Sequence, residues 1–386
     1  MGYIKDHWGF LTAPGQYQGV DLLRSMAVSL VLLFHFAWLP FGWMGVDLFF
    51  ILSGFLIGGI LIDQIRSDRF TFKEFYLRRA LRILPIYYFM IVLCVFTKAW
   101  PLPWDATALR SLASGVFFLH STGPYFFPEV FRIDSRFLPG GTWSLVIEEM
   151  FYLVAPLAIL VVLRAFRGSA RACAVTFGFV ALLAIGVRLF MTRSFAPDDA
   201  NRYFVSFVQF HSRFDELAYG VIGACLIRMR LDLVKFWPYL YTAAGALFAG
   251  FIAYLLIQPR IWKEPYLITA GTIWIPTVLG LSGLCALLVC YQMPIRAKSV
   301  IVLARLSYSL YLVHVLFLEL VRRAGDGQWW PMVADVISTP VRDILGMAGC
   351  VFLSYLLSLL VEYPFIRLYK KPPKAVLQQQ GAISNA

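Results

Sequence analysis

The sequence predicts an all-α fold, a polytopic bundle of about ten transmembrane helices, and two observations lead to this prediction. The chain has 386 residues, of which 60% are hydrophobic and 15% are charged, whereas a soluble domain is about 45–50% apolar and about 25% charged. Apolar runs of about 20 residues, the length that crosses a bilayer as a helix, also recur along the whole chain. Together they exclude the ordinary soluble globular class.

The apolar runs give the expected helices in order. Ten runs are long enough to cross a membrane, and they cover residues 19–39, 44–63, 80–97, 143–163, 172–191, 213–229, 237–257, 271–292, 300–321 and 344–366. A further run at 108–120 is too short to cross, so we expect a re-entrant or partial helix there.

Basic residues predict the orientation of these helices. Lys and Arg concentrate in the loop at 63–79 and in later loops on the same side, which places these loops in the cytoplasm. Both ends of the chain are then cytoplasmic. The segment at 1–18 does not have the layout of a secretory signal, so we expect it to be retained. Residues 19–368 form one transmembrane domain, and we expect a disordered tail at 369–386.

Charge, cysteine and histidine usage exclude several other classes. The net charge is +12, but topology and anionic lipid account for basic residues beside membrane spans. No basic run lies among aromatic residues on a soluble domain, so nucleic-acid binding is not expected. The six cysteines form no CxxC pair, and the five histidines form no HxxxH or HExxH pair. We therefore expect no disulfide framework and no metal site.

The run that begins at Gly19 contains two ionisable residues, Arg24 and His35. They are eleven residues apart, which places them roughly 20° apart around a helix axis and about 16 Å apart along it. They therefore share one face. An ionisable group inside a membrane costs roughly 3 kcal/mol unless it finds a partner or water. The alternative is that the two residues have only structural roles: the arginine extends to the membrane surface, and the histidine forms a hydrogen bond with a neighbouring helix.

Three arginines, Arg78, Arg79 and Arg82, lie at the cytoplasmic end of the third predicted span. Arg78 and Arg82 are four residues apart and share a helix face. The guanidinium fork matches the geometry of phosphate, so the cluster suits a polyanion. The alternative interpretation is an anchor that contacts lipid phosphates.

Ionisable and polar residues also recur at similar depths in the outer half of five different spans. Unsatisfied charges in lipid are prohibitively costly, so this recurrence predicts a hydrated or substrate-filled cavity. The residues are His35, Asp47, Ser53, Glu148, Glu149, Arg213, Asp215, Glu216 and His314.

Six motifs in a fixed order resemble the membrane-bound acyltransferase-3 family. They read GVDLLRSMAVSLVLLFH, GVDLFFILSGFLI, RRALRILPIYY, WSLVIEEMFY, RFDELAYG and LSYSLYLVH, and they extend over nearly the whole chain, from about residue 19 to residue 364. The resemblance implies a multi-pass enzyme of the bacterial cytoplasmic (inner) membrane. Such an enzyme moves an acyl group, commonly acetyl from acetyl-CoA, to a saccharide hydroxyl, often of a cell-surface polysaccharide. Membrane lipid is a further expected partner.

The resemblance also implies roles for individual residues. The Arg-x10-His pair of the family falls on Arg24 and His35, its basic motif on Arg78, Arg79 and Arg82, and its glutamate segment on Glu148 and Glu149. We expect His35 to act as general base or to accept the acyl group transiently. Glu148 or Glu149 is expected to orient its imidazole, and the three arginines to hold the phosphates of acyl-CoA. The expected substrate-binding residues are Asp47, Ser53, Tyr152, Arg213, Asp215 and His314.

Two alternatives stay open at this point. Buried Arg, His and Glu also mark transporters and flippases for a saccharide or small anion, although paired half-repeats, which are common in transporters, are not visible in the sequence. If the protein is an acyltransferase, a glycosylated secondary metabolite is the alternative acceptor. The acyl length, the acceptor hydroxyl and the oligomeric state do not follow from the sequence.

Overall fold

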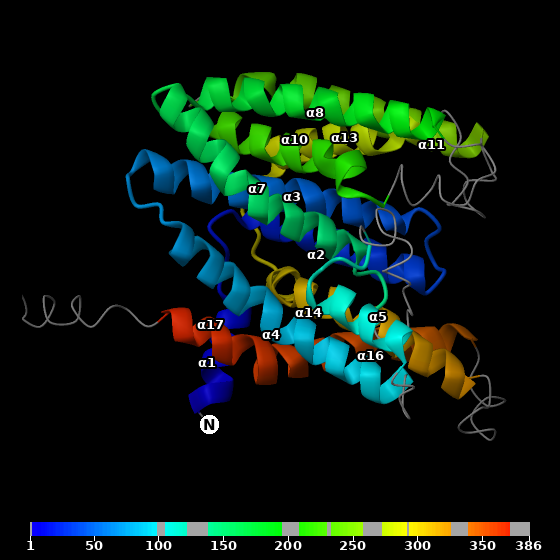
Figure 1. Cartoon of the computed structure of the whole chain (residues 1–386). Helices are drawn as coiled ribbons and strands as arrows, with labels where there is room; N and C mark the ends of the chain where they lie inside the picture. Colours follow the sequence, from blue (N-terminus) through cyan, green and yellow to red (C-terminus); the bar gives the residue numbers. More distant parts are fainter. Residues whose placement is uncertain are drawn as a thin grey trace, which may run out of the picture.

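The structure is a computed structural model that describes residues 2–98, 105–121, 138–194, 208–229, 233–257, 272–291, 293–325 and 339–370. These residues form helices and no strand, which confirms the all-α prediction (Figure 1). The helices are α1 (Gly2–Thr12), α2 (Gln18–His35), α3 (Gly45–Arg66), α4 (Phe72–Lys98), α5 (Ala106–Val116), α7 (Trp143–Ala165), α8 (Ala170–Arg193), α10 (Phe210–Arg228), α11 (Trp237–Ile257), α13 (Ile275–Cys290), α14 (Lys298–Gly325), α16 (Thr339–Leu357) and α17 (Tyr363–Lys370).

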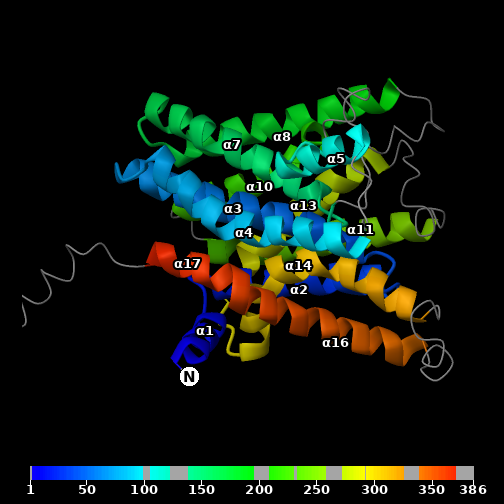
Figure 2. The same ribbon diagram turned by 60° about the horizontal axis from the view of Figure 1, so that its bottom comes forward.

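The long helices lie side by side in layers. In the view of Figure 1, α8, α10, α11 and α13 form the upper part, α2, α3 and α7 the middle, and α4, α14, α16 and α17 the lower part. Helix α3 packs against α2, α7 and α10, and α14 packs against α2 and α16. Helix α1 crosses the end of the bundle beside α17 (Figure 2). The apolar core lies where α3 meets its neighbours, around Phe50, Phe55 and Leu61.

Each of the ten predicted spans overlaps a helix, and the short run at 108–120 overlaps α5. Six helical stretches of the described residues are long and apolar enough to cross a membrane, so the predicted number of about ten is not confirmed. They are Gly42–Arg66, Phe72–Thr97, Trp143–Ala165, Ala170–Arg193, Lys298–Arg322 and Pro340–Leu368. Three of the other helices differ from these six: α2 contains Asp21, Arg24 and His35 and is less apolar, α10 contains four charged residues, and α13 has only 16 residues. The disordered tail was predicted at 369–386; its first two residues belong to α17, which corrects that boundary, and 371–386 lie outside the described residues.

The outward faces of α7 and α8 are apolar. Their large side chains are 56–68% exposed, and these are Leu153, Val154, Leu157, Val161, Phe179, Leu182, Leu183 and Phe190. Soluble proteins rarely expose continuous apolar surface of this kind, whereas lipid tails match it. The chain is therefore a multi-pass membrane protein.

Glycines allow α3 and α10 to cross at close range. A Cβ atom at Gly54 would lie 2.0 Å from the carbonyl oxygen of Leu217, and one at Gly220 would lie 2.2 Å from the carbonyl oxygen of Ile51. Small residues at such crossings let the backbones of membrane helices approach. This approach holds the start of α10, with its charged residues, against α3.

We expect Gly220→Ala to lower the thermal stability of the purified protein, because the added methyl group meets backbone on α3. Overpacking of this kind costs about 1–3 kcal/mol. The control is Gly178→Ala on α8, where nothing lies within 4 Å of the added atom, so stability should hold or rise. Thermal unfolding in detergent measures both variants, and equal melting temperatures for the two would contradict this account of the crossing.

Candidate active site

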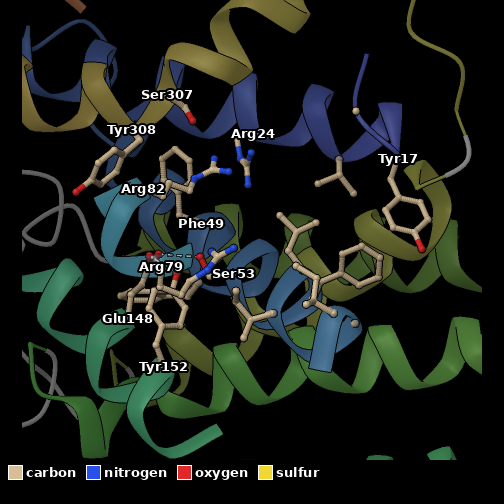
Figure 3. A pocket seen from close by; sticks show the side chains of 18 of the residues that line it. Tyr17, Arg24, Phe49, Ser53, Arg79, Arg82, Glu148, Tyr152, Ser307 and Tyr308 are labelled. Carbon is tan, nitrogen blue, oxygen red and sulfur yellow. Dashed lines mark hydrogen bonds between the residues drawn. The ribbon is translucent and has the colours of Figure 1, made fainter. Parts of the chain in front are cut away.

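A cavity of about 280 Å³ lies between α2, α3, α4, α7 and α14. At one end it is lined by Gln16 and Tyr17, before and at the start of α2, and by Asp63 near the end of α3. At the other end it reaches Ser144 and Tyr311 inside the bundle. The space therefore extends from the ends of α2 and α3 into the bundle, and Figure 3 shows Tyr17 at one side of it and Glu148 and Tyr308 at the other.

Five arginines line this cavity, and four of them come from three neighbouring helices: Arg24 of α2, Arg79 and Arg82 of α4, and Arg305 of α14. Figure 3 shows the guanidinium groups of Arg24 and Arg82 pointing into the same part of the cavity. Arg228 also lines the cavity, but Asp63 neutralises it through two hydrogen bonds of 2.6 and 2.7 Å. The cavity therefore has a cationic wall that suits an anionic ligand.

A second cavity of about 340 Å³ adjoins the first. Arg79, Arg82 and Arg305 line both spaces, and Arg78 lines only the second. Arg78 also forms an ion pair with Glu74 one helical turn earlier. The predicted cluster on α4 thus gathers around two neighbouring cavities, and its guanidinium groups form the boundary between them.

A hydrogen-bonded group lies on the opposite wall from Arg24. The carboxylate of Glu148 accepts hydrogen bonds from Ser53 through Oε1 and from Tyr152 through Oε2, both at 2.9 Å. The Cζ atom of Arg79 lies 5.9 Å from the centre of the Tyr152 ring, and Figure 3 shows Arg79 beside the bond from Ser53 to Glu148. The structure therefore brings together Ser53, Glu148 and Tyr152 from α3 and α7, three residues that the sequence analysis proposed.

His35 lies at the end of α2 and is not among the residues that line either cavity. Its Nδ1 atom is 2.9 Å from the carbonyl oxygen of Val31 and 3.3 Å from Nε2 of His314. Tyr311, at the inner end of the cavity, contacts the His314 ring at a centroid distance of 5.5 Å and the Phe49 ring at 5.9 Å. Tyr311 thus touches both the inner end of the cavity and the histidine pair.

The expected contact between a glutamate and the His35 imidazole is therefore corrected. Glu148 is bound to Ser53 and Tyr152, and the partner of His35 is His314. Glu149 lies next to Glu148 but does not line the cavity, and its Oε1 atom is buried without a hydrogen bond in the described part of the chain. The reason is helix geometry, since successive residues of α7 point about 100° apart.

The charged residues at the start of α10 form ion pairs away from the cavity. Arg213 donates to Asp47 at 2.8 Å and to Glu216 at 3.1 Å, while Asp215 pairs with Arg188 of α8 at 2.9 Å. All five side chains are at most 2% exposed. Asp47, Arg213 and Asp215 thus form ion pairs that join α10 to α3 and to α8 and do not line the cavity, and their substrate-binding role stays a prediction.

Sequence reasoning did not select two residues of the site. Arg305 lines both cavities, donates to the carbonyl oxygen of Ala13 and lies over the ring of Phe10. Glu362 is 2% exposed, accepts a hydrogen bond from Ser309 at 2.9 Å and interacts electrostatically with Arg82 and Arg24. Both are isolated charges in apolar segments, and this signal was visible in the sequence.

The loop before α7 is fixed by His120, which lies outside the spanning helices. The hydroxyl of Thr142 donates to the carbonyl oxygen of Pro139 at 2.9 Å, so the ring of His120, 3.0 Å away, donates to that hydroxyl. Burial lowers the pKa of His120 to about 4, which keeps it neutral at pH 7. Within the described residues no group of three or more His, Cys, Asp or Glu side chains is placed to hold a metal ion.

Comparison with known proteins decides the family. The model of an acyltransferase domain family, acyltransferase-3, matches residues 17–359. The chain belongs to the acyltransferase-3 family. This match covers α2 to α16, and with them the helices that line the first cavity. No solved structure shows a significant match.

Several curated relatives of this acyltransferase-3 chain are known. It is 32% identical over 228 residues to peptidoglycan O-acetyltransferase OatA of Listeria monocytogenes, over 57% of this chain and 34% of the relative. It is 29% identical to the putative peptidoglycan O-acetyltransferase YrhL of Bacillus subtilis, over 83% of this chain and 52% of the relative. For O-acetyltransferase OatA of Staphylococcus aureus the identity is 28%, over 78% and 50%. The matched region thus spans about a third to a half of these relatives.

Proposed function

We propose that this protein is an integral-membrane O-acyltransferase that moves an acyl group, in the first place acetyl, from cytoplasmic acyl-CoA to a hydroxyl of a saccharide. The family and the relatives named O-acetyltransferases support the reaction class. Two relatives are named for peptidoglycan, which makes a cell-envelope sugar the first acceptor to test. The arginine-lined cavity in a membrane bundle is the observation that carries the proposal.

The arginine wall accounts for the donor. The phosphates of CoA are the polyanion that Arg79, Arg82 and Arg305 can bind at the boundary between the two cavities, with Arg78 further out. The uncharged pantetheine arm then extends along the cavity toward Glu148, Tyr152 and Tyr311, and brings the thioester to the centre of the bundle. In this arrangement the basic end of the bundle faces the cytoplasm, consistent with the positive-inside rule.

The chemical step takes place beyond the inner end of the cavity. The acceptor hydroxyl gives its proton to His35 while its oxygen attacks the acyl carbon; the C–S bond breaks, an ester C–O bond forms, and the thiolate takes the proton from the imidazole. In the two-step form of the reaction, His35 first accepts the acyl group itself. Either form requires the Tyr311 ring to move, because this ring lines the cavity and also contacts His314, the partner of His35.

Transfer by the purified protein tests this proposal. The full chain in lipid nanodiscs is given radiolabelled acetyl-CoA and a soluble N-acetylglucosamine oligomer, and mass spectrometry follows the acetyl increment on the sugar. Surface glycans of cells with and without the gene provide the matching test in vivo. Saccharide movement across vesicles without any consumption of acetyl-CoA would overturn the enzyme proposal in favour of the transporter, for which the family match gives no support.

We expect Arg79→Gln and Arg82→Gln each to raise the KM for acetyl-CoA about tenfold or more, because each removes a charge-assisted bond to phosphate worth about 1.5–3 kcal/mol. The kcat should change much less. The control is Arg164→Gln: Arg164 also lies at a basic helix end, but its ion pair with Asp68 is exposed and lines neither cavity. Steady-state kinetics separate the variants, and an unchanged KM in both cavity variants would remove the donor site from this wall.

A further inference from the structure

Two histidines from distant parts of the chain form a hydrogen-bonded pair. His35 ends α2 and His314 lies on α14, and these two helices lie side by side (Figure 2). Their ring centres are 4.6 Å apart at an angle of 74°, with 3.3 Å between Nε2 of His314 and Nδ1 of His35. His314 is 1% exposed and lines neither of the two cavities. Its surroundings therefore differ from those expected of a substrate ligand.

The hydrogen bonds fix the position of each proton. Nδ1 of His314 lies 2.7 Å from the carbonyl oxygen of Tyr311, which can only accept, so the proton of His314 is on Nδ1. Neutral His314 then has its lone pair on Nε2, where it accepts from Nδ1 of His35. The carbonyl oxygen of Val31, 2.9 Å from the same Nδ1, requires a proton there as well. Nε2 of His35 is left with a lone pair.

From this geometry we infer that His314 is a positioning residue for His35. It holds the His35 ring so that the Nε2 lone pair faces the reacting hydroxyl, and it accepts a stronger hydrogen bond once His35 becomes an imidazolium. This inference rests on the proposed function. It reassigns His314 from the predicted substrate-binding set to the support of the base.

Beside other catalytic histidines, a carboxylate orients the imidazole and stabilises the imidazolium. Here the neutral ring of His314 has that function. When Nε2 of His35 takes the proton of the hydroxyl, positive charge develops on the ring, and its Nδ1–H bond to His314 becomes charge-assisted. Tyr311 completes the chain, because its carbonyl oxygen keeps His314 in the tautomer that can accept. Groups that orient the histidine ligands of metals change activity by about 10- to 100-fold when they are removed, and we expect an effect of the same order here.

Kinetics of three variants test the inference. We expect His314→Phe, which keeps a ring but has no acceptor, to lower kcat by about 10- to 100-fold while the KM for acetyl-CoA and for the N-acetylglucosamine oligomer stay within about twofold. His314→Gln, which can place a carbonyl oxygen near the position of Nε2, should recover most of the loss. His35→Ala with His314→Phe should be no slower than His35→Ala alone. The control is His7→Phe, since His7 is a buried histidine with a hydrogen bond to Ser358 on other helices.

The contrary results are specific. A raised KM for the saccharide with unchanged kcat would make His314 a substrate ligand, and an additive double variant would separate it from His35. Nitrogen NMR of histidine-labelled protein reports the tautomer of His314 and does not depend on activity. The chain has only five histidines, so the spectrum is simple. The inference requires the proton of His314 to be on Nδ1. A proton on Nε2 would overturn the inference. Absence of transfer by the unaltered protein would instead refute the proposed function.

Discussion

Replacement of His35 by alanine should lower acetyl transfer by about 10³-fold, within the range of about 10²–10⁴ for loss of a general base. The hydrogen bonds of His35 Nδ1 to Val31 and His314 leave a lone pair on Nε2, where a general base needs it. The measurement is single-turnover transfer from radiolabelled acetyl-CoA to the sugar in nanodiscs. Binding of acetyl-CoA should be nearly unchanged, because His35 does not line either cavity.

The same experiment separates the two chemical roles of His35. If the imidazole accepts the acyl group, mass spectrometry of protein quenched without acceptor finds an acetyl group on His35; if it acts only as base, the protein stays unmodified. Equal amounts of membrane-inserted protein with equal melting temperatures are the control. Full transfer by such a His35→Ala protein would refute the mechanism in both forms.

Replacement of Arg213 by methionine should destabilise the protein by about 3–5 kcal/mol, because the change leaves buried carboxylates without their cation. Arg213 binds Asp47 of α3 and Glu216 of α10, and both partners are almost fully buried. Its guanidinium also lies over the rings of Phe50 and Trp143, at 5.5 and 5.9 Å. Thermal unfolding in detergent and the yield of folded protein measure the effect.

Arg164→Met is the matched control for this variant. Arg164 forms an ion pair of the same 2.8 Å length with Asp68, but the two side chains are 66% and 75% exposed. Exposed pairs contribute about 0–1 kcal/mol, so stability should barely change. If both variants lose the same stability, burial is not what makes the Arg213 pairs important.

The sequence predicted the composition of the site better than its contacts. An arginine cluster on one helix and a glutamate in an apolar helix were recognisable, and the structure gathers Arg24, Arg79, Arg82 and Glu148 around one cavity. The contact between His35 and His314 was not predictable, because it depends on how α2 packs against α14, and helical periodicity contains no information about neighbours.

Charged residues at similar depths in different spans were a less reliable indication of a cavity. Arg213 and Asp215 are two residues apart on α10, so they point to different sides of the helix, and each meets an opposite charge from another helix. Charged residues that neutralise one another and charged residues that line a cavity look alike in a sequence. Only the positions of Asp47 and Arg188 distinguish them.

One wide helical turn changes which side of the last predicted span faces the protein interior. Ser358–Glu362 form a π-helix between α16 and α17. This geometry inserts one extra residue into the helical repeat, so α17 is rotated relative to α16 by about 100°. Phe352 before the turn faces outward, 64% exposed, while Glu362 at its end is directed inward to Ser309. One continuous apolar segment can therefore face lipid in its first part and place a carboxyl group in the protein interior in its second part. A single helical wheel drawn over 344–366 would assign the lipid-facing and inward-facing residues incorrectly.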